Sequence, residues 1–299
     1  MEIPVTLEQD KHKLWTHTDC LSGAQFEYCA VTLHKDYAMN MHAHSFYEVN
    51  IVIHGKGRHF IKNNYIDVEE KCMFVIPPYM EHGYYNVEQL DVLHILLFDG
   101  FLHAYGKEMM SLPGYHTLFD VEPQIREFGN EALFPVLDTE NFEKVLQFIT
   151  ICQQNTESDY AGKYVIQNAA VLQLIGVLCV YMYKGECFSN RSRPSVQLMC
   201  SMEYIKNNCS QSLSVSALAG QSFLSKSTYM RNFKDLCGLS PMQYVRNCRL
   251  ELGKRLLCKP ELTIAQIAQD CGFFDASHFI KEFHEKYGAS PNQYRKQSQ

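Results

Sequence analysis

A pattern that occurs twice in the last third of the chain constrains its fold most. The first copy is LSVSALAGQSFLSKSTYMRNFKDLCGLSPMQYV (213–245), and the second is LTIAQIAQDCGFFDASHFIKEFHEKYGASPNQYR (262–295). The two copies match at one constant offset until a turn in the middle, and the offset then grows by one residue. Solenoid folds need about three or more repeats, so two copies indicate a tandem pair instead.

Each copy predicts a short helix, a tight turn and a second helix. In the second helix Tyr229 and Phe233 recur at i, i+4, as Phe279 and Phe283 do in the second copy, so these rings lie on an inner face. The outer face is polar and cationic, which is typical of a helix-turn-helix that enters the major groove of DNA. Two ordinary helical hairpins are the alternative, but the duplication in register favours the helix-turn-helix. The residues predicted to contact DNA are Ser225, Lys226, Ser227, Met230, Arg231, Lys234, Ala276, Ser277, Ile280 and Lys281.

Several short motifs carry a more specific resemblance. They include Leu218-Ala219, Gly238-Leu239-Ser240-Pro241, Gly272-Phe273 and Ser290-Pro291. With these motifs, residues 196–299 resemble the DNA-binding domain of the AraC/XylS family of bacterial transcription regulators. The resemblance implies an all-α domain of about seven helices, in which a long helix over 240–258 links two helix-turn-helix units. It also implies double-stranded DNA with direct repeats and RNA polymerase as partners.

The distribution of charge agrees with this interpretation, although the net charge of the chain is −6. Residues 196–299 contain 13 Lys and Arg against 8 Asp and Glu, a net +5, so residues 1–195 carry −11. The cationic field therefore lies on the segment with the two repeats, as binding by counterion release requires. An excess of five positive charges is modest, which favours binding as a homodimer.

The N-terminal part, from Phe26 to about Asp99, has strand-like periodicity. His42, His44 and Glu48 alternate along one predicted strand, so their side chains project to the same side. Their spacing, followed by that of Pro77 and His82, resembles the two motifs of the cupin barrel. This resemblance implies an all-β, cupin-like effector-sensing domain over 1–137, with these side chains in the barrel interior. The chain as a whole is therefore predicted to have two domains.

The barrel residues admit two interpretations. Three imidazoles and a carboxylate can bind Fe, Mn, Ni or Zn with open positions for a substrate, so one interpretation is a divalent metal held by His42, His44, Glu48 and His82. The other is a pocket for a small-molecule effector, with a sugar as the first choice, lined by His42, His44, Glu48, Arg58, His82 and Tyr84. Tyr79, which replaces the glycine of the second motif, is expected to narrow the cavity.

Three functions are consistent with these features. The first is a transcription regulator that responds to an effector in the barrel. The second is a metal-dependent cupin enzyme with a DNA-binding tail, and the third is a constitutive regulator whose barrel only dimerises. We favour the first and expect no enzyme, with no catalytic and no cofactor-binding residues, because a fold alone does not establish an activity.

The remaining segments predict connections and a dimer contact. Residues 100–137 are rich in Gly and Pro and are expected to wind irregularly with a short helix or two. Residues 138–184 are expected to form a helical dimerisation segment, because the part from Tyr164 to Tyr183 is apolar nearly all round; the alternative is that these helices only cover their own barrel. Residues 185–195 are polar and predict a linker, with Ser195 as the cap of the next helix.

Composition favours a cytoplasmic protein without membrane contact. The N-terminus lacks a charged start followed by an apolar run, and the longest apolar stretch, 169–183, is too short to span a bilayer. The 12 cysteines occur singly, so neither a zinc module nor a disulfide framework is predicted.

Overall fold

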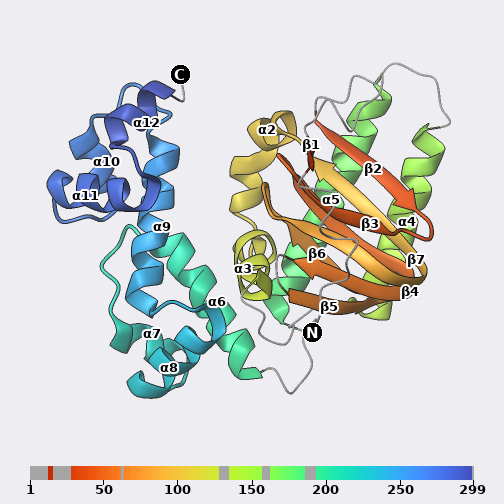
Figure 1. The fold of residues 1–299 in the computed structure, drawn as a ribbon, viewed down its shortest axis with the longest axis horizontal. Coiled ribbons are helices and arrows are strands. Elements are labelled where there is room, and N and C mark those ends of the chain that lie inside the picture. The colour runs from red at the N-terminus through yellow and green to blue at the C-terminus, as the bar shows by residue number, and fades with distance from the viewer. Residues whose placement is uncertain are drawn as a thin grey trace. The chain divides into compact units, whose positions relative to one another are not determined.

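The structure is a computed structural model that describes residues 13–15, 28–61, 64–127, 135–156, 162–185 and 193–297. The chain divides into two compact units between Val196 and Gln197 (Figure 1). The first is built on a sheet and the second is entirely helical in its described part, which confirms the predicted fold class.

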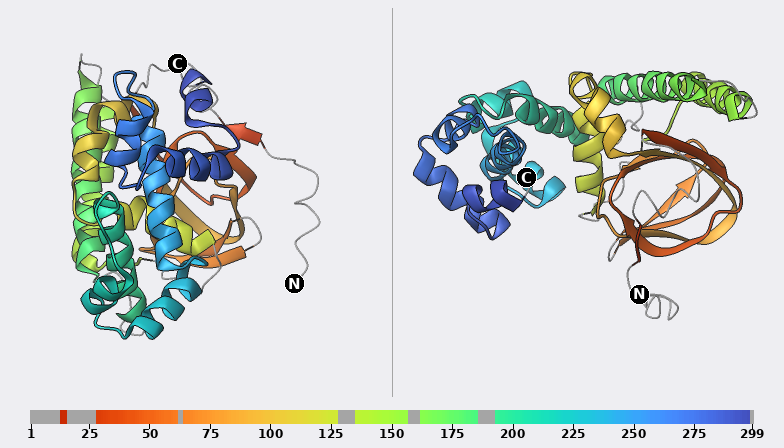
Figure 2. Two further views of the ribbon diagram at one scale, coloured as in Figure 1. Left: turned by 90° about the vertical axis from the view of Figure 1, so that its left-hand side faces the viewer. Right: turned by 90° about the horizontal axis from the view of Figure 1, so that it is seen from above.

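Seven strands form one sheet that closes into a barrel when seen from above (Figure 2). The two longest strands, β4 and β7, pair along most of their length. Strands β2 and β3 pair with different halves of β7, and β5 and β6 pair with different halves of β4. The strands are β1 (Lys13–Trp15), β2 (Cys29–His34), β3 (Met39–His44), β4 (Tyr47–Ile61), β5 (Asn64–Glu69), β6 (Met73–Ile76) and β7 (His82–Leu97).

An irregularity in β4 decides which side chains reach the barrel interior. Near the start of the strand all five residues from Glu48 to Val52 are buried, and Val52 belongs to the same core cluster as Ile61. Gly55 then adopts a left-handed backbone with φ 78°, and a Cβ there would lie 2.1 Å from the carbonyl oxygen of Gln89. The pairing with β7 shifts register around this point. Beyond it the odd-numbered residues His59 and Ile61 are the buried ones.

Helices follow the barrel in the first unit. They are α2 (Asp99–Met110), the π-helix η2 (Thr117–Val121), α3 (Glu122–Glu127), α4 (Thr139–Thr156) and α5 (Lys163–Lys184). The prediction of a mostly irregular segment over 100–137 was wrong for its described part, because α2, η2 and α3 fill most of it. Gly106 lies inside α2, and Pro123 lies in the first turn of α3, where proline lacks no needed hydrogen bond.

Helix α5 is longer than the apolar stretch suggested. By length and composition alone its 22 residues would suffice to cross a membrane, so the prediction that this stretch is too short was wrong. Such a helix is weak evidence for a membrane span, because the core helix of a globular domain has the same composition. Here α5 packs on the barrel: Gln167 Nε2 donates to the carbonyl oxygen of Cys29 at 3.3 Å, and the Tyr181 hydroxyl donates to that of Val136 at 2.9 Å.

The second unit has seven helices within residues 193–297. They are α6 (Arg193–Asn208), α7 (Val215–Gln221), α8 (Lys226–Cys237), α9 (Pro241–Leu256), α10 (Ile264–Asp270), α11 (Ala276–Tyr287) and α12 (Pro291–Gln297). Helix α6 begins at Arg193, so Ser195 lies in its first turn and is not its cap, contrary to the prediction. Of the predicted linker, residues 186–192 lie outside the described residues.

Helix α9 belongs to the cores of both repeats. It begins with a capping box between Ser240 and Gln243, which satisfies the first backbone donors of the helix. In its first turns Tyr244 packs edge-on against Phe233 of α8, with ring centroids 5.5 Å apart. Nearer its end, Gly253 lets α11 approach, because a Cβ there would lie 2.7 Å from the Phe279 ring. One helix therefore fixes both α8 and α11.

Candidate functional site

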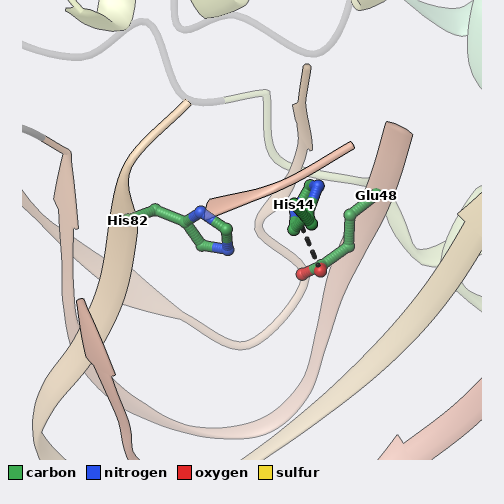
Figure 3. Close-up of side chains that lie close together, drawn as sticks. All are labelled: His44, Glu48 and His82. Carbon is green, nitrogen blue, oxygen red and sulfur yellow. Dashed lines mark ion pairs between the residues drawn. The ribbon is translucent and has the colours of Figure 1, made fainter. Parts of the chain in front are cut away.

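Three polar side chains from different strands meet inside the barrel. His44 ends β3, Glu48 lies near the start of β4, and His82 begins β7. Their ligand atoms all lie within 4.8 Å of one another, and His44 Nε2 is 3.3 Å from a Glu48 carboxylate oxygen (Figure 3). All three side chains are buried. The predicted fourth member, His42, is close by, with its ring centroid 4.2 Å from that of His82.

Backbone carbonyl oxygens orient the imidazole rings of His42, His44 and His82. The Nδ1 atoms of His42, His44 and His82 lie 2.9, 2.7 and 2.9 Å from the carbonyl oxygens of Asn40, Phe46 and Met80. A carbonyl oxygen only accepts, so each Nδ1 carries the proton and donates it. Each Nε2 atom is then the one available to a ligand, and an Nδ1–H held by a carbonyl oxygen is the usual arrangement of metal-binding histidines.

Burial sets the charges of the cluster. It lowers the pKa of His82 to about 3 and that of His94 to about 4, so both rings are neutral at neutral pH. Burial alone would raise the pKa of the Glu48 carboxyl, but the neighbouring His94 and His44 hold it well below its ordinary range. The cluster therefore combines the Glu48 carboxylate with the neutral imidazole of His82, and His94 beside it is neutral as well. Two oriented Nε2 atoms and a carboxylate fit a divalent first-row metal ion.

The structure adds polar residues that the sequence motifs did not identify. His94 Nε2 lies 3.7 Å from a Glu48 oxygen, and His94 Nδ1 lies 2.8 Å from Nδ1 of His34. Asn50 and His59 are fully buried, and their side-chain polar atoms have no hydrogen-bond partner among the described residues. Strand alternation from Glu48 could have revealed Asn50. His59 could not be found in this way, because it follows the shift of phase at Gly55.

Tyr84 lies inside the barrel, and its hydroxyl has no partner among the described residues. Arg58 and Tyr79 were also expected at the barrel interior, but both lie elsewhere. Arg58 lies on the outer face of β4, where its Nε donates to Asp67 Oδ1 at 3.0 Å, so its assignment to the interior was wrong. Tyr79 does not narrow the barrel either, because 68% of it is exposed while its backbone N–H donates to the His44 carbonyl oxygen at 2.7 Å.

The two repeats form two helix-turn-helix units. Helices α7 and α8 form the first and α10 and α11 the second, and in both the second helix is capped at its N-terminus, by Ser225 and Asp275 respectively. Nine of the ten residues predicted to contact DNA are exposed, and Ala276 is half-buried. The hydroxyl of Ser225 also accepts from the backbone N–H of Thr228 as part of the cap.

The outer faces of α8 and α11 present cations at equivalent places. Arg231 and Lys281 each follow a fully buried ring by two residues, Tyr229 and Phe279, and both are exposed. Lys281 Nζ lies 4.0 Å from a Glu285 oxygen on the same face, and both side chains are mostly exposed, so this pair leaves Lys281 accessible. Each helix therefore offers at least one accessible cation next to polar side chains.

Models of two known domain families match the two units of the chain. A model described as "AraC-like ligand binding domain" matches residues 27–146, and one described as "Helix-turn-helix domain" matches residues 218–297. The probable transcriptional regulator LumQ of Photobacterium leiognathi is 24% identical over 260 residues, covering 87% of this chain and 93% of that protein. The HTH-type transcriptional activator RhaS of Escherichia fergusonii is 24% identical over 254 residues, covering 85% of this chain and 86% of that protein.

Solved structures are similar to about a third of the chain. The DNA-binding domain of AdpA in complex with a target DNA is 26% identical with a TM-score of 0.33, covering 34% of this chain and 91% of that one. A transcriptional regulator with an AraC-type DNA-binding domain from Chromobacterium violaceum is 26% identical with a TM-score of 0.34, covering 37% of this chain and 96% of that one.

Proposed function

The chain belongs to the AraC/XylS family of DNA-binding transcription regulators, and from this premise we propose that a small molecule in its barrel controls how a homodimer binds operator DNA. The protein acts in the cytoplasm, together with RNA polymerase, and it is not an enzyme. The observation that carries the proposal is the pair of helix-turn-helix units on the shared helix α9, attached to a barrel with a buried polar cluster.

DNA binding is assigned to the outer faces of α8 and α11. Because α9 packs against both helices, the two reading faces keep a fixed separation. Helix-turn-helix pairs of this kind read half-sites about one DNA turn apart, near 10–10.5 base pairs. The two half-sites of one protomer are therefore expected on one face of the duplex, and a homodimer would repeat this pair directly.

Effector binding is assigned to the barrel interior. His59, Tyr84 and Asn50 bring donors and acceptors that have no partner among the described residues, and leaving such groups unpaired in a protein costs about 1–3 kcal/mol each. Neutral rings, an amide and a phenol match the hydroxyl groups of a sugar. The effector would shift an equilibrium between two states of the regulator by its different affinity for them.

A divalent metal ion is a second occupant of the barrel, and it fits another group of buried side chains. His44, Glu48 and His82 would hold it, and it would supply a Lewis acid for an oxygen of the effector. Metal analysis of protein purified without chelators tests this part. Turnover of a small substrate by the metal-loaded protein would instead favour the cupin enzyme.

Dimerisation is assigned to α4 and α5. Their outer sides expose several large apolar residues, which a monomer would leave in water. These residues are Leu146, Ile151, Tyr164, Val165, Ile166, Val180 and Tyr183.

A selection experiment tests the DNA-binding proposal. The full-length chain is used to select duplexes from a random-sequence pool, and the enriched duplexes are then titrated at several salt concentrations. We expect a direct-repeat motif and an affinity that falls steeply with salt. The double variant Arg231→Ala with Lys281→Ala should lose this binding, whereas Arg58→Ala, on the barrel exterior, should keep it. If no motif is enriched, the proposed function is wrong.

A further inference from the structure

The outer faces of α8 and α11 share an apolar side chain among polar ones. Met230 and Ile280 occupy the same position in the two helices, one residue before Arg231 and Lys281. They are 42% and 38% exposed, respectively, so neither belongs to the core of its unit. An apolar side chain in the middle of a DNA-reading face has no role in binding phosphate.

A more exposed aromatic ring precedes each of these helices. Phe223 is 88% exposed and Phe274 is 95% exposed, and each lies one or two residues before the cap of its helix, Ser225 or Asp275. Burying a phenylalanine would stabilise the fold by about 1.5–3 kcal/mol, and neither ring makes this contribution.

Phe223 also has an unfavourable backbone. Its φ is +54°, in the left-handed region that bulky residues rarely adopt, and the equivalent residue of the second unit is Gly272 with φ +80°. A glycine would therefore satisfy this turn better than phenylalanine does. Strain and exposure at one residue, beside the end of a recognition helix, indicate that the ring serves a contact outside the unit.

We propose that these side chains read thymine methyl groups, with Met230 and Phe223 in one half-site and Ile280 and Phe274 in the other. The N-terminal end of a recognition helix approaches the base edges most closely. The thymine 5-methyl is the apolar group that these edges present, and phenylalanine and aliphatic side chains contact it. This proposal rests on the proposed DNA binding and adds a base preference to it.

DNA explains the arrangement better than a protein partner does. Protein-binding surfaces gather apolar side chains into a continuous core of several hundred Å². Here Met230 lies between Lys226 and Lys234, one helical turn away on either side, and Ile280 lies beside Ser277, Lys281 and His284. Isolated apolar groups between cations suit isolated methyl groups between phosphates.

Replacing thymine by uracil tests the proposal, because uracil lacks only the methyl group. Duplexes that the full-length chain selects from random-sequence DNA are prepared with thymine or with uracil at each position of the motif. Burying one methyl group contributes about 0.8 kcal/mol, so each methyl that is read should change affinity about fourfold. At least one such thymine is expected in each half-site.

Variants assign the effect to the named residues. Phe274→Ala and Ile280→Ala should abolish the thymine preference in one half-site, and Phe223→Gly and Met230→Ala should abolish it in the other. Met242→Ala is the matched control, because Met242 is 43% exposed but lies on α9. Melting curves of all variants verify that they fold.

Two results would overturn the inference while leaving DNA binding intact. One is equal affinity of the unmodified chain for thymine and uracil duplexes at every position. The other is an unchanged thymine preference in all four variants, and loss of transcription activation in these same variants would then assign the rings to a protein partner. Failure to enrich any duplex would overturn the proposed function itself.

Discussion

Phe223→Gly should stabilise the helical unit. The substitution removes little buried surface, because the residue is 88% exposed. It relieves a left-handed backbone, which costs a non-glycine residue about 1–2 kcal/mol. The greater freedom of glycine in the unfolded chain offsets about 0.5–1 kcal/mol of this. With the central values of these two ranges, the net gain in the free energy of unfolding is about 0.75 kcal/mol.

Calorimetry of a fragment that contains residues 193–299 measures this gain. For a unit of this size, 1 kcal/mol shifts Tm by about 4–8 °C, so Phe223→Gly should raise Tm by about 3–6 °C. The reciprocal variant is Gly272→Ala, at the equivalent place in the second unit. Its Cβ would lie 2.4 Å from the carbonyl oxygen of Ser210, a backbone atom that has little room to move.

The two variants should therefore act in opposite directions. Gly272→Ala combines a left-handed alanine with a steric overlap, so it should lower the free energy of unfolding by more than about 2 kcal/mol. A lower Tm for Phe223→Gly would refute the strain assigned to this turn. A tolerated Gly272→Ala would show that the turn adapts and that the equivalence of the two positions has no energetic meaning.

Four further predictions concern function and assembly. Arg231→Ala should weaken binding to the selected duplex by about 1–3 kcal/mol and should weaken binding to a scrambled duplex by a smaller amount. Equal losses of affinity on both duplexes in salt titrations would mean that Arg231 only contacts phosphate. His82→Ala should abolish the transcriptional response to the effector while DNA binding is retained, and Arg58→Ala should respond normally; a reporter assay with both variants decides this. Val165→Asp, at a residue of α5 that is 70% exposed, should convert the dimer to a monomer in sedimentation of the full-length chain, and Lys107→Asp on α2 should not. The first unit should lose stability in urea as pH falls below 6.5, by up to about 1.4 kcal/mol per pH unit for each of His82 and His94. These rings stay neutral in the folded protein, with pKa values of about 3 and 4, but take up a proton in the unfolded chain, so constant stability from pH 7 to 5 would contradict their burial.

The helical unit was predictable from sequence because its signals are local. Tyr229 with Phe233, and Phe279 with Phe283, define a buried face within one helix, and all four rings are fully buried. The serine before Pro241 caps α9 through contacts with residues of the first turn of the helix. Such patterns depend on residues close together in the chain, and the duplication gives two independent instances of each.

The barrel was less predictable because its site depends on pairing between distant strands. Alternation along one predicted strand put His44 and Glu48 on one side, but the structure brings them together from two strands, because β3 ends at His44 and β4 begins at Tyr47. It failed for Arg58 because the irregularity exchanges the inner and outer faces. His94 approaches Glu48 only because β4 and β7 are neighbours, and no local motif encodes that pairing.

Sharing α9 between the two repeats has an evolutionary consequence. Tyr244 completes the core of one copy and Gly253 that of the other, so the duplicated segments could not remain separate modules that recombine freely. Substitutions on α8 or α11 can change the sequence of one half-site at a time. The distance between half-sites, by contrast, is inherited with α9, so descendants of this protein can diversify their target sequences more easily than the spacing of those targets.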